Sequence, residues 1–149
     1  MLKTPITVHQ LSSDHSELML QVFVQGTRPA ELFRALTEPE FLTRWWPTHA
    51  EVDAREGGRY CLSWPAMNWH LRGRFIMVIR PELLIYTWSW DHKPDLAERT
   101  VTIRLMYHDG GTLLSLWHGP YDRSDQDQAD RQSHLEGWRH FLPKLCAII

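Results

Sequence analysis

The sequence is poor in features that would assign a function on their own. It has only two cysteines, Cys61 and Cys146, too few for a disulfide framework or a cysteine-ligated zinc site. We therefore expect two reduced thiols in a cytoplasmic protein. The formal net charge of -2 gives no electrostatic reason to bind nucleic acid or an anionic membrane surface. The chain lacks a run of about 18 apolar residues and an N-terminal signal core, so we expect no membrane insertion.

Catalytic and metal-binding motifs are also missing. None of the nine histidines forms the i, i+4 helical pair of a metal clamp. No spacing suggests a Ser–His–Asp or Cys–His arrangement, and the Gly57-Gly58 pair lacks the lysine and the following helix of a phosphate-binding loop. We therefore predict no metal ion, no cofactor and no catalytic residue, and we favour a binding protein over an enzyme.

The C-terminal stretch from Ser124 to Ile149 predicts one long amphipathic helix. Its apolar residues recur every three or four positions, and Ser124 is a suitable N-cap. The turns from Gln126 to Ser133 are nearly all polar, so we expect the helix to begin in solvent and to pack from about Leu135 onward. Pro143 removes a helical hydrogen bond and should kink the last turns.

Two neighbouring residues of this helix bear on its packing. Gly137 costs about 1 kcal/mol relative to alanine in a helix interior, which suggests that another backbone or a bulky side chain approaches closely there. Trp138 lies on the face that meets the rest of the protein. We predict that Trp138 is mostly buried and forms part of a cavity wall.

The rest of the chain alternates between strands and turn signals. A short edge strand is expected at Ile6, Val8 and Gln10, before a turn at Ser12 to Ser16. The expected order is then a strand over 18–24, short helices capped by Thr27 and Thr37, strands over 51–55, 59–64, 69–79, 83–90, 99–107 and 112–118, and the long helix. Gly73, inside one strand, suggests a bulge or a close contact. This order predicts a single α+β domain over residues 1–149.

Several motifs in this order resemble the family named after the activator of the heat-shock protein 90 ATPase, of the START or Bet v 1-like (SRPBCC) superfamily. The resemblance covers residues 17–147. The matching residues are Leu32 to Thr37 with Pro39-Glu40, Arg44 to Pro47, Val52 to Tyr60, Gly73, Pro81, Leu84 to Trp90, Gly111 to His118 and Gly137-Trp138.

The resemblance implies a helix-grip fold, in which a curved seven-stranded antiparallel sheet wraps around the long C-terminal helix with a cavity between them. It does not imply one activity, because family members include ligand binders and stress-related proteins. Contact with a chaperone is one alternative. The eukaryotic co-chaperone carries a further N-terminal domain, to which nothing in this sequence corresponds.

Aromatic residues carry the best functional signal, since eight tryptophans are unusual for a domain of this size. On the expected strand faces they would line one apolar pocket with a few polar tips, with Met67 adding adaptable surface. The predicted ligand-binding residues are Trp45, Trp46, Trp64, Trp69, Met77, Tyr86, Trp88, Trp90, His118, His134 and Trp138. The predicted ligand is a small apolar or aromatic molecule. The alternative is a packed core without a usable hole.

Two further interpretations stay open. His118 and His134 could lie at the cavity mouth, where a histidine can change charge near neutral pH. A cyclase or hydrolase would need one of these histidines, or Asp53, to project into the pocket. Without such a role, Asp53 braces the Gly57-Gly58 hairpin or pairs with Arg55 or Arg59.

Trp117 and Leu113 lie on the opposite strand face from Leu116, and exposure of that face would suit a homodimer.

Overall fold

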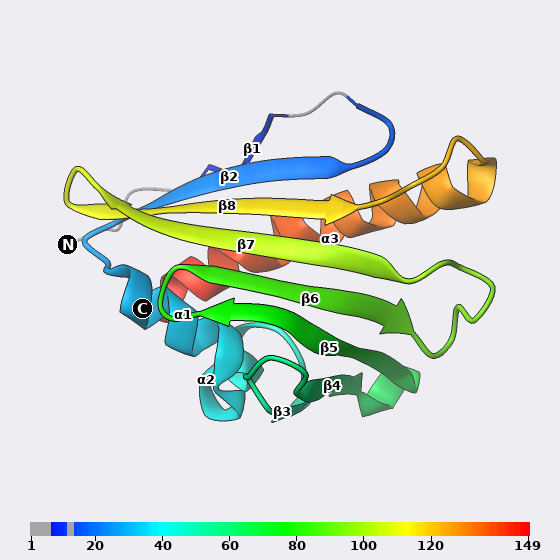
Figure 1. Cartoon of the computed structure of the whole chain (residues 1–149), viewed down its shortest axis with the longest axis horizontal. Helices are drawn as coiled ribbons and strands as arrows, with labels where there is room; N and C mark the ends of the chain where they lie inside the picture. The colour runs from blue at the N-terminus through cyan, green and yellow to red at the C-terminus, as the bar shows by residue number, and fades with distance from the viewer. Residues whose placement is uncertain (1–6, 12–13) are drawn as a thin grey trace.

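The computed structural model describes residues 7–11 and 14–149 and consists of an eight-stranded antiparallel sheet that wraps around the long helix α3 (Figure 1). The strand order is β1-β2-β8-β7-β6-β5-β4-β3. The elements are β1 (His9–Gln10), β2 (Leu18–Gln25), α1 (Pro29–Thr37), α2 (Pro39–Trp45), β3 (His49–Val52), β4 (Arg59–Trp64), a 3-10 turn (Pro65–Met67), β5 (Trp69–Ile79), β6 (Leu83–Trp90), β7 (Arg99–His108), β8 (Gly111–Gly119) and α3 (Asp125–Ala147).

The predicted α+β helix-grip fold is confirmed, and β4, β5 and β6 have the predicted bounds. The sheet has eight strands rather than seven because β1 adds to its edge. Ile6 and Ser12 of the predicted edge strand and turn lie outside the described residues. The strand expected over 51–55 is instead His49–Val52, because Arg55 folds back and its amide donates to the Asp53 carbonyl (2.9 Å).

The predicted caps of the two short helices are wrong. Arg28 and Glu38 occupy the N-cap positions, each followed by a proline. The Thr27 hydroxyl donates to the Val24 carbonyl (2.7 Å) and the Thr37 hydroxyl to the Phe33 carbonyl (2.8 Å), so both bond to the chain behind them. The predicted cap of α3 is confirmed, since the Ser124 hydroxyl accepts from the Asp127 amide (3.1 Å).

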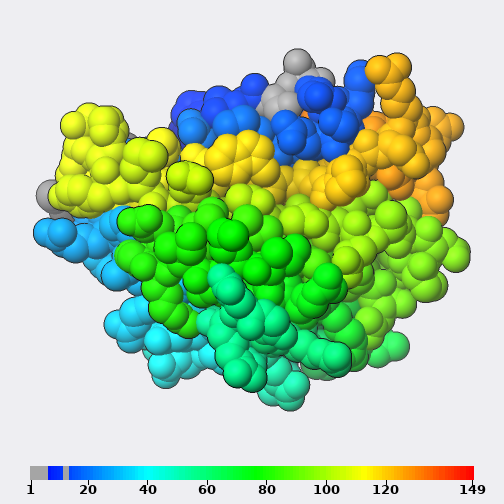
Figure 2. All heavy atoms as spheres, in the orientation of Figure 1, coloured from blue at the N-terminus to red at the C-terminus, as the bar shows by residue number. Residues whose placement is uncertain are grey.

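The core lies between the inner face of the sheet and the apolar face of α3. Alternate residues of β2, β7 and β8 point inward, and the C-terminal half of α3 contributes Leu135, Trp138, Leu142 and Leu145, all buried. The strands hide this half of the helix when the molecule is seen from the outer face of the sheet (Figure 2). Gly73 is the predicted close contact, because a Cβ there would lie 2.1 Å from the Thr87 carbonyl oxygen.

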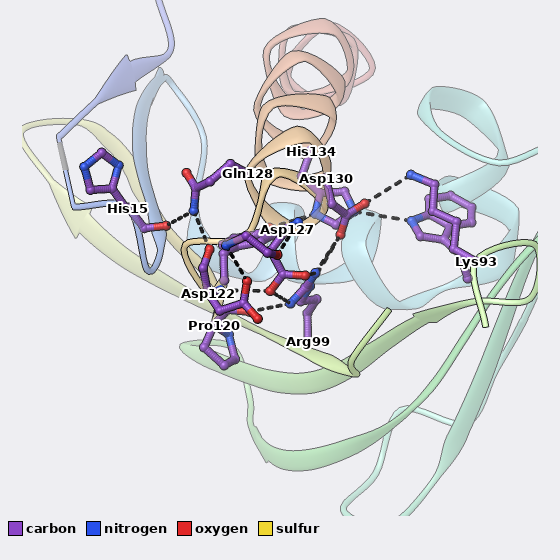
Figure 3. Close-up of polar contacts among 12 residues, drawn as sticks. His15, Lys93, Arg99, Pro120, Asp122, Asp127, Gln128, Asp130 and His134 are labelled. Atoms are coloured by element: carbon purple, nitrogen blue, oxygen red, sulfur yellow. Dashed lines mark hydrogen bonds and ion pairs between the residues drawn. The ribbon is translucent and has the colours of Figure 1, made fainter. Parts of the chain in front are cut away.

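The polar first turns of α3 pack against the rest of the protein along one face, contrary to the prediction that the helix begins in solvent. Asp127 and Asp130 are buried and face Arg99, whose side chain is 2 % exposed at the start of β7 (Figure 3). The guanidinium donates to both oxygens of Asp127 (3.0 Å each) and to Asp130 (3.2 Å). The hydrogen bonds from Arg99 hold the pKa of Asp127 below its usual value. An ion-pair cluster thus fixes the half of the helix that has no apolar stripe.

Replacement of Arg99 by methionine tests this anchor. The variant leaves Asp127 and Asp130 buried without their shared cation, so we expect the free energy of unfolding to fall by about 3–5 kcal/mol. Chemical denaturation at pH 7 measures the change.

The matched control is Arg72→Met, which removes another arginine that pairs with an aspartate. Arg72 donates to Asp91 (2.9 Å), but the two side chains are 56 % and 42 % exposed. Its loss should therefore cost less than about 1 kcal/mol. Equal costs for the two variants would contradict an anchoring role for Arg99.

Candidate functional site

A cavity of about 450 Å³ lies between the middle of α3, the ends of β4–β6 and the loop after β6. Its lining residues are Trp46, Trp64, Met67, Trp69, Trp88, Trp90, His92, Lys93, Ser133, His134, Gly137, Trp138 and Phe141. Most of its walls are aromatic rings that come from separate elements of the fold. The cavity is therefore a product of tertiary packing rather than of one local motif.

The tryptophans form one connected cluster with Trp46 at its centre. The Trp46 ring centroid lies 5.4 Å from that of Trp138, 5.7 Å from that of Trp88 and 6.0 Å from that of Trp64. Trp90 continues the cluster toward Trp69. Tilted, stacked and edge-on contacts at these separations are favourable and fix ring orientation. The aromatic walls are consequently held in place by their contacts with one another.

Seven of the predicted ligand-binding residues line this cavity: Trp46, Trp64, Trp69, Trp88, Trp90, His134 and Trp138. Trp45 lies behind Trp46, and its indole donates to the Ala35 carbonyl (2.8 Å). Tyr86 lines a separate hollow of about 20 Å³, which has room for about one water molecule. His118 is buried beside the lining residues without being one of them.

Met77 was predicted to line the pocket, and that prediction is wrong. The register of β5 against β6 shifts between Phe75 and Met77, so Met77 points to the outer face and is 36 % exposed. An irregularity of this kind reverses the alternation of side chains. Met67, from the 3-10 turn, supplies the flexible apolar side chain of the cavity instead.

The sequence interpretation missed the polar rim. His92 and Lys93 come from the loop after β6, and Ser133 from α3. The same three residues line an adjoining polar groove of about 340 Å³. The His92 imidazole stacks on Trp69, with ring centroids 4.8 Å apart and planes 10° apart. The loop after β6 is polar and has no hydrophobic periodicity, so the sequence did not indicate a role for it. The available signal was the position of His92 and Lys93, separated by Asp91 alone from the end of the aromatic strand β6.

Gly137 does not mark a close contact, contrary to prediction. No heavy atom lies within 4 Å of the position that a Cβ would occupy, leaving aside the neighbouring residues and the local helix backbone. The residue instead lines the cavity. Its missing side chain leaves open space beside the tryptophan walls.

His118 and His134 form a buried stacked pair, with ring centroids 4.4 Å apart. Trp138 Nε1 donates to His118 Nδ1 (3.0 Å), and His134 Nδ1 bonds to Tyr121 Oη (2.7 Å). Burial lowers the pKa of His118 well below its usual value and that of His134 to about 4. Neither imidazole therefore changes charge near neutral pH, contrary to the interpretation from the sequence.

Asp53 lies away from the cavity, on the outer surface. Arg55 donates to its carboxylate (2.8 Å), which is one of the alternatives that the sequence left open.

In residues 7–11 and 14–149, no group of three histidine, cysteine or acidic side chains is arranged to hold a metal ion. Within the same described part of the chain, no helix combines the length and apolar character needed to cross a membrane.

The sequence matches the model of one known protein family over most of its length. The model of the family described as Activator of Hsp90 ATPase homolog 1-like protein matches residues 26–149. The chain belongs to this family. The match includes α1, α2, every strand from β3 onward and α3, and so all the elements that line the cavity.

Solved structures share the fold of this family member. A Rhodobacter sphaeroides protein is 21 % identical with a TM-score of 0.79, covering 95 % of this chain and 97 % of its own. A Mycobacterium smegmatis protein is 19 % identical with a TM-score of 0.77, covering 97 % of each chain. An HSP90 activator from Plasmodium falciparum is 24 % identical with a TM-score of 0.68, covering 89 % of this chain and 93 % of its own. At these identities the likeness concerns the fold alone.

A direct comparison with curated protein sequences found no match.

The outer face of the sheet carries apolar side chains, with Phe23 39 % and Met106 51 % exposed beside half-buried Leu113 and Trp117. The predicted homodimer through this face stays a prediction.

The buried histidines make stability depend on pH. His134 has a pKa of about 4 in the fold against 6.5 for a free side chain, because burial and the nearby Lys93 and Arg99 outweigh Asp130. Between these pH values the unfolded chain binds more protons, so the free energy of unfolding falls as the pH drops. We expect His134 alone to remove about 2 kcal/mol between pH 7 and 5, with His118 acting in the same direction.

Denaturation of His134→Gln across this pH range measures the contribution. The variant should lose a large part of the pH dependence, whereas His140→Gln, on the exposed side of the same helix, should keep it. Asp127 stays ionised in both states above pH 5, because its pKa is 3.8 in the unfolded chain and lower in the fold. Full parental pH dependence in His134→Gln would show that another group titrates.

Proposed function

We propose that this protein binds a small apolar or aromatic molecule in the tryptophan-lined cavity without transforming it. The observation that carries the proposal is a space of about 450 Å³ whose walls are mainly aromatic rings from separate elements. Ligand sites of small molecules fall in this size range, and they combine apolar walls with a few polar groups.

The rigidity of the cluster supports binding over simple core packing. Trp46, Trp88 and Trp138 contact one another at centroid separations of 5.4–5.7 Å, and Trp88 and Trp138 are 4 % and 3 % exposed. Side chains fixed in this way lose little further conformational entropy when a ligand enters. A flat apolar ring would find faces and edges of indole rings in place.

An enzymatic alternative, a cyclase or hydrolase in the same cavity, has weaker support. Of its three candidate residues, His134 lines the cavity, His118 lies behind the wall and Asp53 lies outside. His134 Nδ1 bonds to Tyr121, and its Nε2 lies 3.4 Å from the donating Trp90 indole. A general base needs a free nitrogen aimed at the substrate, and these contacts occupy both.

A co-chaperone role is supported by the family and by the similarity in fold to the HSP90 activator of Plasmodium falciparum. Its test is the ATPase rate of the host chaperone with and without this protein. We expect no stimulation, and a stimulated rate that survives blocking of the cavity would favour the interaction role.

Gly137→Phe tests the cavity as the binding site. The added ring should enter the open space beside the tryptophans and compete with a ligand. In the parent, apolar two-ring and three-ring compounds should quench tryptophan fluorescence and raise the melting temperature. In Gly137→Phe, both responses should be lost while the protein stays folded.

The matched control is Gly137→Ala. A methyl group meets no atom within 4 Å and should stabilise the helix by about 1 kcal/mol. This variant should retain binding. Undiminished binding by Gly137→Phe would show that the ligand lies elsewhere, and no response of the parent to a broad panel of apolar compounds would overturn the proposal.

A further inference from the structure

The tryptophan-lined cavity adjoins a polar groove of about 340 Å³, and the two hollows have very different walls. His92, Lys93 and Ser133 line both, so they form the border between them. Beyond this border the groove lies between the loop after β6 and the first turns of α3, where its lining residues are Pro94, Asp95, Leu96, Gln126, Ala129 and Asp130. A molecule that occupies the cavity therefore has room to extend into a second, polar space.

Three exposed polar side chains of the groove are unused by the fold. Asp95, Gln126 and Ser133 form no side-chain hydrogen bond or ion pair with the residues that the structure describes. A carboxylate only accepts hydrogen bonds, whereas an amide and a hydroxyl group both donate and accept. The groove thus presents free donors and free acceptors together.

Lys93 adds further donors at the border of the two hollows (Figure 3). Its ammonium group has three N–H bonds and donates one of them to Asp130 (3.1 Å). The Lys93 side chain is 34 % exposed, so its other N–H bonds can reach a bound molecule. Asp130 does not depend on this contact alone, because Arg99 also donates to it (3.2 Å).

The charges of the groove favour an uncharged ligand group. Among the described residues that line it, Asp95 and Asp130 are acidic and Lys93 is a cation. His92 is neutral at pH 7, since burial lowers the pKa of its imidazole below the usual value. An anionic group would meet two carboxylates, and an ammonium group would meet Lys93. Hydroxyl groups carry no charge and satisfy both kinds of partner, because each one donates and accepts.

We propose that the ligand is an aromatic compound with an uncharged, polyhydroxylated substituent, of the aryl glycoside class. Its ring system occupies the tryptophan cavity, and its hydroxyl groups lie in the groove, where they bond to Asp95, Gln126 and Ser133. This inference rests on the proposed function, since it specifies the occupant of the same cavity. Apolar walls that bind the body of a ligand and a few polar groups that orient it are the usual combination in small-molecule sites.

Closing the groove while the cavity stays open tests the proposal. Ala129 lines the groove but not the cavity and is exposed on α3, so Ala129→Phe should fold normally while its ring fills the groove. The probes are 2-naphthyl β-D-glucopyranoside and 2-methoxynaphthalene, an aryl ether without the sugar. In calorimetric titrations, the variant should raise the Kd of the glucoside at least about tenfold, the worth of one to two hydrogen bonds. The Kd of 2-methoxynaphthalene should not change.

Gln132→Phe is the matched control, because Gln132 is exposed on the same helix and lines neither hollow. It should keep both parental Kd values. Gln126→Ala removes one bonding side chain without filling the groove, and it should raise the Kd of the glucoside about fivefold. Gly137→Phe, which fills the cavity, should weaken the binding of both probes.

The corresponding glucuronide tests the choice of an uncharged group. It carries a carboxylate in place of the hydroxymethyl group of the glucoside. The parent should bind it more weakly than the glucoside, and Asp95→Asn should reduce the difference, because the variant removes one of the carboxylates that line the groove. Tighter binding of the glucuronide by the parent would overturn the assignment of an uncharged substituent.

The outcomes separate this inference from the proposed function. If 2-methoxynaphthalene does not bind the parent, the proposed function fails and this inference fails with it. If 2-methoxynaphthalene binds but the glucoside does not, the cavity binds apolar rings and only the glycoside assignment is overturned. A Kd of the glucoside that Ala129→Phe leaves unchanged, or that Gln132→Phe raises equally, also overturns it, because the sugar then does not lie in the groove.

Discussion

The placement of α3 depends on the buried contact of Arg99 with Asp127 and Asp130. Hydrophobic packing at Leu142 and Leu145 fixes only the C-terminal half of this helix. The ion-pair cluster fixes the other half to the start of β7, and a planar guanidinium bonded to two carboxylates allows little freedom of angle. The cavity faces the stretch of α3 between these two attachments, from residue 133 to residue 141. A helix held at both ends can span a space that it does not fill.

The tryptophan cluster explains how that space stays open. A hole lined by flexible aliphatic side chains tends to collapse, since each side chain can rotate into it. Indole rings that brace one another around Trp46 have few alternative rotamers, and Trp45 supports them from behind through its bond to Ala35. The same packing isolates Trp88 Nε1 and His118 Nε2 from water. Rigidity and unpaired polarity therefore have a common structural cause.

The sequence predicted what depends on periodicity. Alternation gave the bounds of β4 to β6 and the inward face that carries Trp64 and Trp88, since the side-chain period follows directly from backbone geometry. It failed where a local event interrupts the period. The shift in β5 turned Met77 outward, and Asp127 is buried by an arginine 28 residues away in sequence. Ion pairs between distant residues and side chains from loops, such as His92, have no periodic signature.

Gly137 supports the proposal of a binding cavity over an imperfectly packed core. A glycine in the middle of a helix lowers the stability of the helix by about 1 kcal/mol relative to alanine. The close approach of a neighbouring atom normally explains why glycine stands there. Here no neighbour exists, because a methyl group would meet no atom within 4 Å. A fold constrained only by stability would favour alanine or a larger apolar residue at this position, since either would improve the helix and fill the hole. The glycine therefore supports the proposed binding cavity independently of the tryptophans.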